Sequence, residues 1–309
     1  MNTITSNSDT IGLYEKFEVT FDVPASFSNP YNYDEISVTA IFTSPSSKTF
    51  QVDGFYYQDF TVYAPSGTLI PKGLPNWKIR FAPSEVGSWT YVISVTDKNG
   101  TFNFPAMNFD CVASANPGFV RKANDRYLRF DAGKPYFAIG ENIGWYGSNT
   151  IFDYQEWMTK LSANGGNWMR VWMCSWAFAI EWKDTGLGNY EKRQGRAFQL
   201  DWVLDRAQEQ GIYVQLCLNN HGQVSTRVNA EWQNNPYNSA NGGPCQNTWQ
   251  FFTNSDAKKY FKNRMRYIIA RWGYATNLMA WELFNEVDLT DDFDQHRTEV
   301  SLWHNEMAG

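Results

Sequence analysis

The residues of this chain that could do chemistry are Asn285 and Glu286, which close the apolar run 277–284. Such a run is typical of a buried β-strand, and a (β/α) barrel places its catalytic carboxylates at the C-terminal ends of its strands. The same Asn-Glu pair recurs at Asn305 and Glu306, in a stretch typical of a helix. Position therefore decides the interpretation: Glu286 is predicted to be a catalytic acid, with a structural carboxylate as the alternative.

Short alternating segments fill the first third of the chain. Residues 17–23, 36–42 and 89–95 alternate apolar and polar side chains, as half-buried strands do. Residues 1–115 are therefore predicted to form an antiparallel β-sandwich of immunoglobulin-like size, roughly 100 residues. The sequence does not decide whether such a sandwich binds sugar or only supports the second domain.

The pattern changes after the punctuating sequence Ala-Asn-Pro-Gly at 115–118. Gly211 is predicted to end one helix, and a second helix is predicted to begin near Asn254 or Ser255 and to end at Gly273. Strands alternating with helices favour a parallel sheet of βαβ units. The expected strands are 135–140, 168–173, 212–218 and 277–284, and the expected helices are 154–163, 198–210 and 255–272.

Counting these units limits the second domain. A complete eight-stranded barrel takes about 250 residues, whereas residues 116–309 hold four βα units. We therefore expect this region to be the N-terminal half of a (β/α)8 TIM barrel, cut after its fourth βα unit, from a longer protein. The unpaired edges of the first and fourth strands then predict self-association.

Composition excludes several kinds of partner. The 26 Lys and Arg residues are scattered and are outnumbered by 32 Asp and Glu, which argues against nucleic acid. No apolar stretch approaches the roughly 18 residues of a membrane span. Four distant cysteines and only three histidines give no metal-binding spacing, so neither a metal nor another cofactor is expected. Aromatic residues, at 17%, suit stacking on sugar rings or burial in a core.

Several motifs together resemble the retaining glycoside hydrolases of clan A, especially the family 5 type and its cellulase-like members with an N-terminal immunoglobulin-like domain. The resemblance covers nearly the whole chain. It is carried by Arg170, by Asn220-His221-Gly222, by residues 281–286, and by residues 235–244 and 267–273.

The resemblance implies that Glu286 is the general acid/base and that Asn285 binds the sugar 2-hydroxyl. Breaking a glycosidic bond requires a carboxyl group that protonates the leaving oxygen and later takes a proton from water. The nucleophilic carboxylate of the family ends the seventh strand, which these residues do not contain. Glu282 is expected about 13 Å down the strand from Glu286, at about 3.3 Å per residue, and Asp288 lies where the chain leaves it. We therefore expect the nucleophile to be missing.

Other strand-end residues are candidates for substrate binding. By the resemblance, His221 would line the cleavage subsite, although a structural histidine is the alternative, and Asn220 beside it would bind substrate. Arg170 would orient the missing nucleophile, or form an ion pair inside the barrel, for which Glu282 is a candidate partner. Barrel geometry alone adds Glu141 and Trp145 after the first strand and Trp176 after the second, as hydrogen-bonding or stacking groups.

Two further expectations concern the backbone. A regular strand cannot point both Asn285 and Glu286 into one site, so a bulge or other irregular backbone is predicted there. The loop 222–252, rich in Asn, Gln and Gly, is too long for a simple connection and is predicted to be a binding loop. Trp232 and Trp249 within it are possible stacking platforms.

The sequence and its resemblance therefore predict a glycoside hydrolase acting on a β-linked polysaccharide or oligosaccharide, with this chain lacking the nucleophile. The rival is a carbohydrate-binding protein without catalysis. Residues 1–10 are polar and contain no apolar export segment. The compartment stays open, although a polysaccharide substrate favours secretion or the periplasm.

Overall fold

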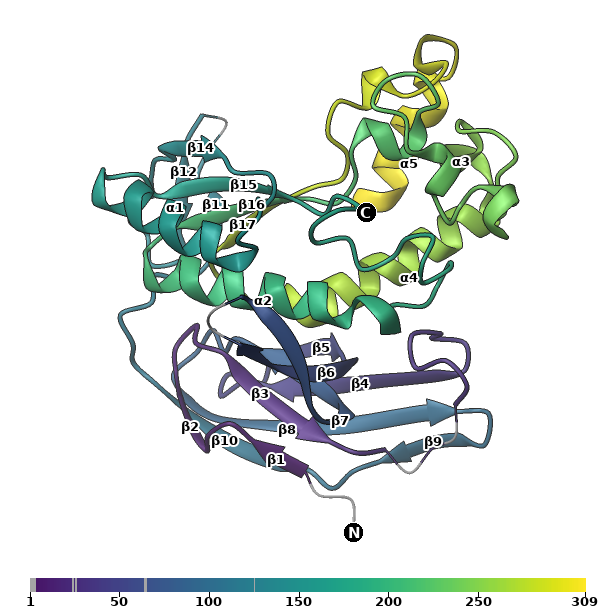
Figure 1. Cartoon of the computed structure of the whole chain (residues 1–309). Helices are drawn as coiled ribbons and strands as arrows, with labels where there is room; N and C mark the ends of the chain where they lie inside the picture. Colours follow the sequence, from purple (N-terminus) through teal and green to yellow (C-terminus); the bar gives the residue numbers. More distant parts are fainter. Residues whose placement is uncertain (1–3, 24, 26, 64–65, 125) are drawn as a thin grey trace. The chain divides into compact units, whose positions relative to one another are not determined.

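The computed structural model describes residues 4–23, 25, 27–63, 66–124 and 126–309 (Figure 1). The chain divides into two compact units whose segments interleave in the sequence. The first comprises Met1–Thr61, Ile70–Ala138 and Met265–Met279, and the second comprises Val62–Leu69, Ile139–Arg264 and Ala280–Gly309. The linear division into 1–115 and 116–309 stays a prediction.

The first unit contains two β-sheets that share an apolar core. One sheet has the strand order β1-β3-β7-β6, from β1 (Ile4–Ser6), β3 (Phe17–Phe21), β6 (Phe55–Tyr63) and β7 (Thr68–Phe81). The other has the order β2-β10-β8-β4-β5, with β9 paired to β8, from β2 (Thr10–Gly12), β4 (Ile36–Thr43), β5 (Thr49–Asp53), β8 (Gly87–Asp97), β9 (Gly100–Asn103) and β10 (Met107–Val112).

Alternate residues of the facing strands fill this core. Phe17, on β3, stacks on Phe109 of the opposite sheet with ring centroids 4.0 Å apart, and Phe81 stacks on Phe42 at 4.2 Å. Along β3 and β4, inward residues are buried and their neighbours are less so. The two-sheet sandwich expected from the alternating pattern is therefore present, but it is not wholly antiparallel, because β2 and β10 pair in parallel.

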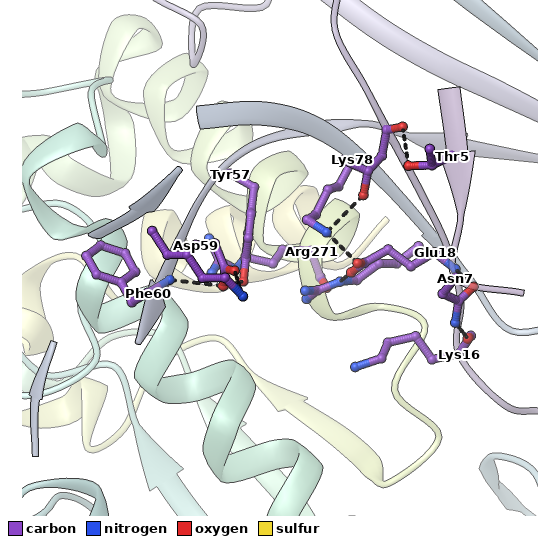
Figure 2. A network of polar contacts seen from close by, with 12 residues as sticks. Thr5, Asn7, Lys16, Glu18, Tyr57, Asp59, Phe60, Lys78 and Arg271 are labelled. Carbon is purple, nitrogen blue, oxygen red and sulfur yellow. Dashed lines mark hydrogen bonds and ion pairs between the residues drawn. The ribbon is translucent and has the colours of Figure 1, made fainter. Parts of the chain in front are cut away.

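A buried ionic cluster joins β3 to β7 (Figure 2). Glu18 accepts hydrogen bonds from Arg80, at 2.7 Å, and from Lys78. Burial alone would raise the pKa of Glu18, but the charges of Arg80 and Lys78 outweigh it and lower the pKa to about 2. The Arg80 guanidinium also donates to the carbonyl of Arg271 at 3.1 Å and lies 5.1 Å from the Phe55 ring centroid.

A small antiparallel sheet corrects the predicted position of the first barrel strand. Pro135–Tyr136 is β13, which pairs with β12 (Leu128–Phe130), which in turn pairs with β11 (Val120–Lys122). A tight turn explains the difference: Gly133 takes a left-handed φ of 87°, and Phe130 N–H donates to the Lys134 carbonyl at 2.9 Å. The local hairpin therefore takes up residues 135–136, and the first strand of the larger sheet starts at Gly140.

The second unit is built on a sheet with strand order β14-β15-β16-β17. β14 pairs with β15, and β15 with β16, in parallel. The strands are β14 (Gly140–Asn142), β15 (Trp168–Trp172), β16 (Tyr213–Cys217) and β17 (Leu278–Glu282). The α-helices are α1 (Ile151–Ala163), α2 (Gln194–Glu209), α3 (Gln250–Thr253), α4 (Ser255–Trp272) and α5 (Arg297–Ala308).

Two of the predicted helix boundaries are confirmed. Gly211 has a left-handed φ of 68° and follows Gln210, the C-cap residue of α2, as a glycine that ends a helix does. The Asn254 side chain accepts hydrogen bonds from the backbone N–H groups of Asp256 and Ala257, and so caps α4. No helix among the described residues is long and apolar enough to cross a membrane.

The long loop 222–252 folds into short helical turns. Trp232 is only 5% exposed, so its predicted use as a stacking platform is wrong, because a buried ring offers no face to a sugar. Trp249 is half-buried and stacks on His296 with ring centroids 4.7 Å apart.

The described residues include the 3₁₀ helices η1 (Glu191–Arg193), η2 (His221–Val224), η3 (Trp232–Asn234), η4 (Ser239–Asn241), η5 (Val287–Leu289) and η6 (Phe293–Gln295).

Candidate active site

Three neighbouring strands bring the main candidate residues together. Arg170 lies on β15, His221 follows β16, and Asn285 and Glu286 follow β17. Parallel neighbours present their C-terminal ends at one edge of the sheet, which is where barrel enzymes carry their active sites. These four side chains form a continuous chain of polar contacts.

Arg170 is held by an ion pair with Glu282. Its Nε donates to Glu282 Oε2 at 2.6 Å, and its Nη2 also donates to the same carboxylate. Gln215, on the strand between them, donates to Glu282 Oε2 at 2.8 Å. The hydrogen bond to Glu282 is the largest cause that raises the pKa of Arg170. Of the two partners considered for Arg170, the structure places Glu282 beside it.

Asn285 connects this ion pair to Glu286. Its Oδ1 accepts from Arg170 Nη2 at 2.5 Å, and its Nδ2 donates to Glu286 Oε2 at 3.1 Å. Asn285 is only 4% exposed, whereas the Glu286 side chain is 53% exposed. The buried amide therefore orients a carboxylate that solvent or a ligand can reach.

The backbone departs from a regular strand before and at this pair. β17 ends at Glu282. At the next residue, the Asn219 side-chain amide donates a hydrogen bond to the Leu283 carbonyl at 2.8 Å. Asn285 then forms an isolated parallel bridge with Asn220. Glu286 has a left-handed φ of 50° and ψ of 47°, which lets both consecutive side chains join one cluster. The predicted irregular backbone is confirmed, while the strand is shorter than predicted.

His221 contacts the other side of Glu286. Its Nδ1 lies 3.0 Å from Glu286 Oε2, and its Nε2 lies 2.9 Å from Asn229 Oδ1. The imidazole is 7% exposed, and the neighbouring Asn220 is 4% exposed. His221 thus makes a direct contact with the candidate acid, whereas Asn220 is placed beside it through the backbone bridge.

Exposed aromatic rings follow the first two strands of the sheet. Trp145 and Trp176 are 43% and 44% exposed, and their ring centroids lie 5.2 Å apart in an edge-to-face arrangement. Trp172 supports Trp145 at 5.4 Å. Such partly open rings have the form of a sugar-stacking surface.

Glu141 lies in a different environment from the Glu286 cluster. It is exposed on β14 and lines a cavity of about 580 Å³ together with Asn142, Trp145 and Trp157. Glu286 and His221 are not among the residues that line this cavity. Within the described residues, no three His, Cys, Asp or Glu side chains are grouped closely enough to hold a metal ion.

Two loop residues near His221 were not predicted. Asn229 binds the imidazole, and Glu231 accepts a hydrogen bond from Ser175 at 2.5 Å. Burial raises the pKa of Glu231, while the Ser175 hydrogen bond and the charges of Arg193 and His221 act to lower it. The length and composition of the loop 222–252 were the only sequence signals for these residues, and they do not single out a position.

Comparisons with known proteins cover both parts of the chain. Residues 10–96 match the family model described as "Domain of unknown function (DUF5060)". Mannan endo-1,4-beta-mannosidase 1 of Oryza sativa subsp. japonica is 30% identical over 207 residues, which are 62% of this chain and 45% of the relative. Mannan endo-1,4-beta-mannosidase 5 of Solanum lycopersicum is 28% identical over 211 residues, 62% of this chain and 47% of the relative.

A crystal structure from Bacteroides vulgatus ATCC 8482, provisionally described as a glycoside hydrolase, has a similar fold. It aligns with a TM-score of 0.64 at 17% identity, covering 96% of this chain and 54% of that one. This chain spans about half the length of the curated relatives it matches. These likenesses support a glycoside hydrolase.

Proposed function

We propose that this chain carries the acid/base half of the active site of a retaining glycoside hydrolase. The observation that carries the proposal is the placement of Glu286 at the strand-end edge of the sheet, in contact with Asn285 and His221. We also propose that the sandwich is immunoglobulin-like and that the parallel sheet is the first half of a (β/α)8 barrel. The fold likeness over 96% of the chain supports this architecture.

In the proposed reaction, Glu286 protonates the glycosidic oxygen as the bond to the anomeric carbon breaks. The proton moves from the Glu286 carboxyl to the leaving oxygen, which takes the electron pair of the broken bond. In the same step the second carboxylate forms a bond to the anomeric carbon. In the second step water attacks that carbon while the Glu286 carboxylate takes the water proton, and the bond to the second carboxylate breaks, which frees that carboxylate. Asn285, held by Arg170, binds the 2-hydroxyl, and Trp145 and Trp176 stack on neighbouring sugar rings.

The nucleophile of this proposal is supplied from outside these residues. Retaining hydrolysis needs a second carboxylate about 5 to 5.5 Å from the acid. Glu282, the candidate on the strand before Glu286, forms an ion pair with Arg170. The four-stranded sheet and the half-length coverage of the relatives support a second carboxylate beyond the four βα units.

The proposed substrate is a β-1,4-linked mannan, because the relatives that match 62% of this chain are named as mannan endo-1,4-beta-mannosidases. Side chains suited to a neutral polysaccharide support it: the Asn and Gln residues of the loop 222–252 offer amide groups to sugar hydroxyls. The partly exposed Trp145 and Trp176 offer ring faces to sugar C–H groups.

The test begins with the protein in hand. The 309-residue chain and Glu286→Gln are incubated with mannan, glucan and xylan, and reducing ends are measured. No release is expected from either protein, while calorimetry with mannan oligosaccharides detects binding. Release that Glu286→Gln abolishes would refute the missing nucleophile, and absence of binding to all three polymers would refute the sugar site.

Reading the gene beyond the codon for Gly309 separates the enzyme from the rival binding protein. Four further βα units with a strand-ending Glu would support the enzyme, and Glu286→Gln in that longer chain should then lower mannan hydrolysis by about 10² to 10⁴-fold. A stop codon combined with mannan binding would favour a carbohydrate-binding protein without catalysis.

A further inference from the structure

Asn219 binds the backbone at two points between β17 and Glu286. Its side-chain Nδ2 donates to the Leu283 carbonyl at 2.8 Å, and its backbone carbonyl accepts from Asn285 N–H at 2.9 Å. Asn219 is 3% exposed, so both contacts are sheltered from water. A single buried residue that follows β16 therefore holds the segment that leads to the candidate acid.

The orientation of the Asn219 amide is set by Arg264 of α4. Arg264 Nη2 donates to Asn219 Oδ1 at 2.6 Å. A guanidinium can only donate and a backbone carbonyl can only accept, so the amide oxygen must face Arg264 and the amide nitrogen must face Leu283. The reversed amide would place donors together on one side and acceptors together on the other. Arg264 thereby selects the orientation in which Asn219 holds the Leu283 carbonyl.

Arg264 is itself held in a buried position. It is 8% exposed, its guanidinium lies 4.9 Å from the Phe261 ring centroid, and its Nη1 lies 3.8 Å from Glu181 Oε2. Glu181 is 1% exposed, and its Oε1 accepts from Gly188 N–H at 2.7 Å. The distance from Arg264 to Glu181 is too long for a hydrogen bond. Glu181 therefore balances the charge of Arg264, whereas the contact of Arg264 with Asn219 is directional.

We infer that Arg264 is a positioning residue for the Asn285–Glu286 pair and acts through the Asn219 amide. The inference rests on the proposed function for its catalytic meaning, because the backbone that is held carries the proposed acid/base. The left-handed φ of 50° at Glu286 is a costly conformation for a residue with a Cβ, and such a conformation persists only where surrounding contacts impose it. The two contacts of Asn219 impose it from the N-terminal side.

Loss of Arg264 would leave the Asn219 amide free to reverse. A reversed amide turns its oxygen towards the Leu283 carbonyl, and the carbonyl is then left without a donor. The segment from Leu283 to Glu286 should open more often as a result, without opening of the neighbouring strands.

The test is residue-resolved amide hydrogen exchange by NMR, recorded on the chain without substrate. The reporter is Asn285 N–H. The internal control is Met173 N–H, which donates to the Cys217 carbonyl at 2.8 Å and reports the opening of β15 from β16.

The decisive variant is Arg264→Met combined with Glu181→Gln, because it removes the donor to Asn219 without leaving a buried charge unpaired. Exchange at Asn285 should become about tenfold faster, since a hydrogen bond from a charged group is lost, and exchange at Met173 should stay within about twofold. Glu181→Gln alone is the matched control: it keeps the Arg264 donor and should leave exchange at Asn285 unchanged.

A second variant keeps the test independent of the loss of Arg264. Asn219→Asp retains an acceptor for Arg264 but has no N–H for the Leu283 carbonyl, so it should speed exchange at Asn285 as the double variant does. Equal acceleration at Asn285 and Met173, or unchanged exchange at Asn285 in the double variant, would overturn the inference.

Sugar binding is measured in parallel by calorimetry with mannan oligosaccharides. The double variant should bind them at least about fivefold more weakly, and an unchanged Kd beside faster exchange at Asn285 would overturn the link between Arg264 and the site. If the unsubstituted chain binds no sugar, the proposed function fails, while the exchange rates still decide whether Arg264 holds the segment before Glu286.

Discussion

Acidification should weaken the sandwich unit chiefly through Glu18. This carboxylate, on β3, forms ion pairs with Arg80 and Lys78 of β7, of which Figure 2 shows the one with Lys78, and its side chain is only 17% exposed. Its pKa is about 2 in the folded chain against an ordinary value of 4.5. Because the folded pKa is the lower one, ionised Glu18 stabilises the fold above pH 4.5, and this contribution is lost as the pH falls towards 2.

The size of the effect follows from these two values. A difference of about 2.5 pKa units corresponds to about 3 kcal/mol of folding free energy at neutral pH, of which about 2 kcal/mol is lost by pH 3. Glu18→Gln keeps the shape of the side chain and removes its charge. The variant should therefore be about 3 kcal/mol less stable at pH 7 and only about 1 kcal/mol less stable at pH 3.

The assay is amide hydrogen exchange of peptides from β3 and β7 in increasing urea, because it reports the opening of this unit alone. Glu35→Gln is the matched control: Glu35 is an exposed carboxylate of the same unit and accepts a hydrogen bond from Ser28 N–H at 2.8 Å. It should change stability far less than Glu18→Gln. A difference between Glu18→Gln and the unsubstituted chain that stays constant from pH 7 to pH 3 would refute the reasoning.

Three further predictions concern the second unit. Arg170→Met should lower the free energy of unfolding by about 3 kcal/mol, because it leaves the Glu282 carboxylate without its cation. The double variant Arg170→Met with Glu282→Met should recover most of that loss in urea unfolding, and an equal loss in the single and double variants would contradict the prediction. Trp145→Ala and Trp176→Ala should each weaken mannan-oligosaccharide binding by about 1 kcal/mol, roughly fivefold in Kd by calorimetry, and an unchanged Kd would remove that ring from the site. The edge strands β14 and β17 should cause concentration-dependent self-association in sedimentation experiments, which a monodisperse monomer at all concentrations would contradict.

Patterns of neighbouring residues were enough to predict those features that depend only on near neighbours in the chain. The alternation of residues 17–21 predicted an inward and an outward face, because successive side chains of a strand point to opposite sides. Gly211 and Asn254 predicted helix ends because left-handed backbone and side-chain capping involve only near neighbours. Even the irregular backbone at Glu286 was predictable, since two consecutive side chains cannot face one site from a regular strand.

Local patterns failed where a competing neighbour decided the outcome. Residues 135–140 contain a strand-like run, yet the turn at Gly133 pairs Pro135–Tyr136 with β12 instead. Trp232 and Trp145 are equally aromatic in the sequence, but the first is 5% and the second 43% exposed. Exposure depends on which other segments cover a ring, and no period in the sequence encodes that.

Sequence patterns were enough to predict two kinds of sheet and to place Glu286, Asn285, His221 and Arg170 at or near strand ends. The contacts that these side chains make became visible only in the folded chain. Arg170 contacts Glu282, which lies 112 residues further along the sequence. His221, which follows one strand, contacts Glu286, which follows the next strand of the sheet. These contacts depend on the register of the strands and on how the loops close. Packing of the whole sheet sets both, and the sequence neighbours of each residue do not.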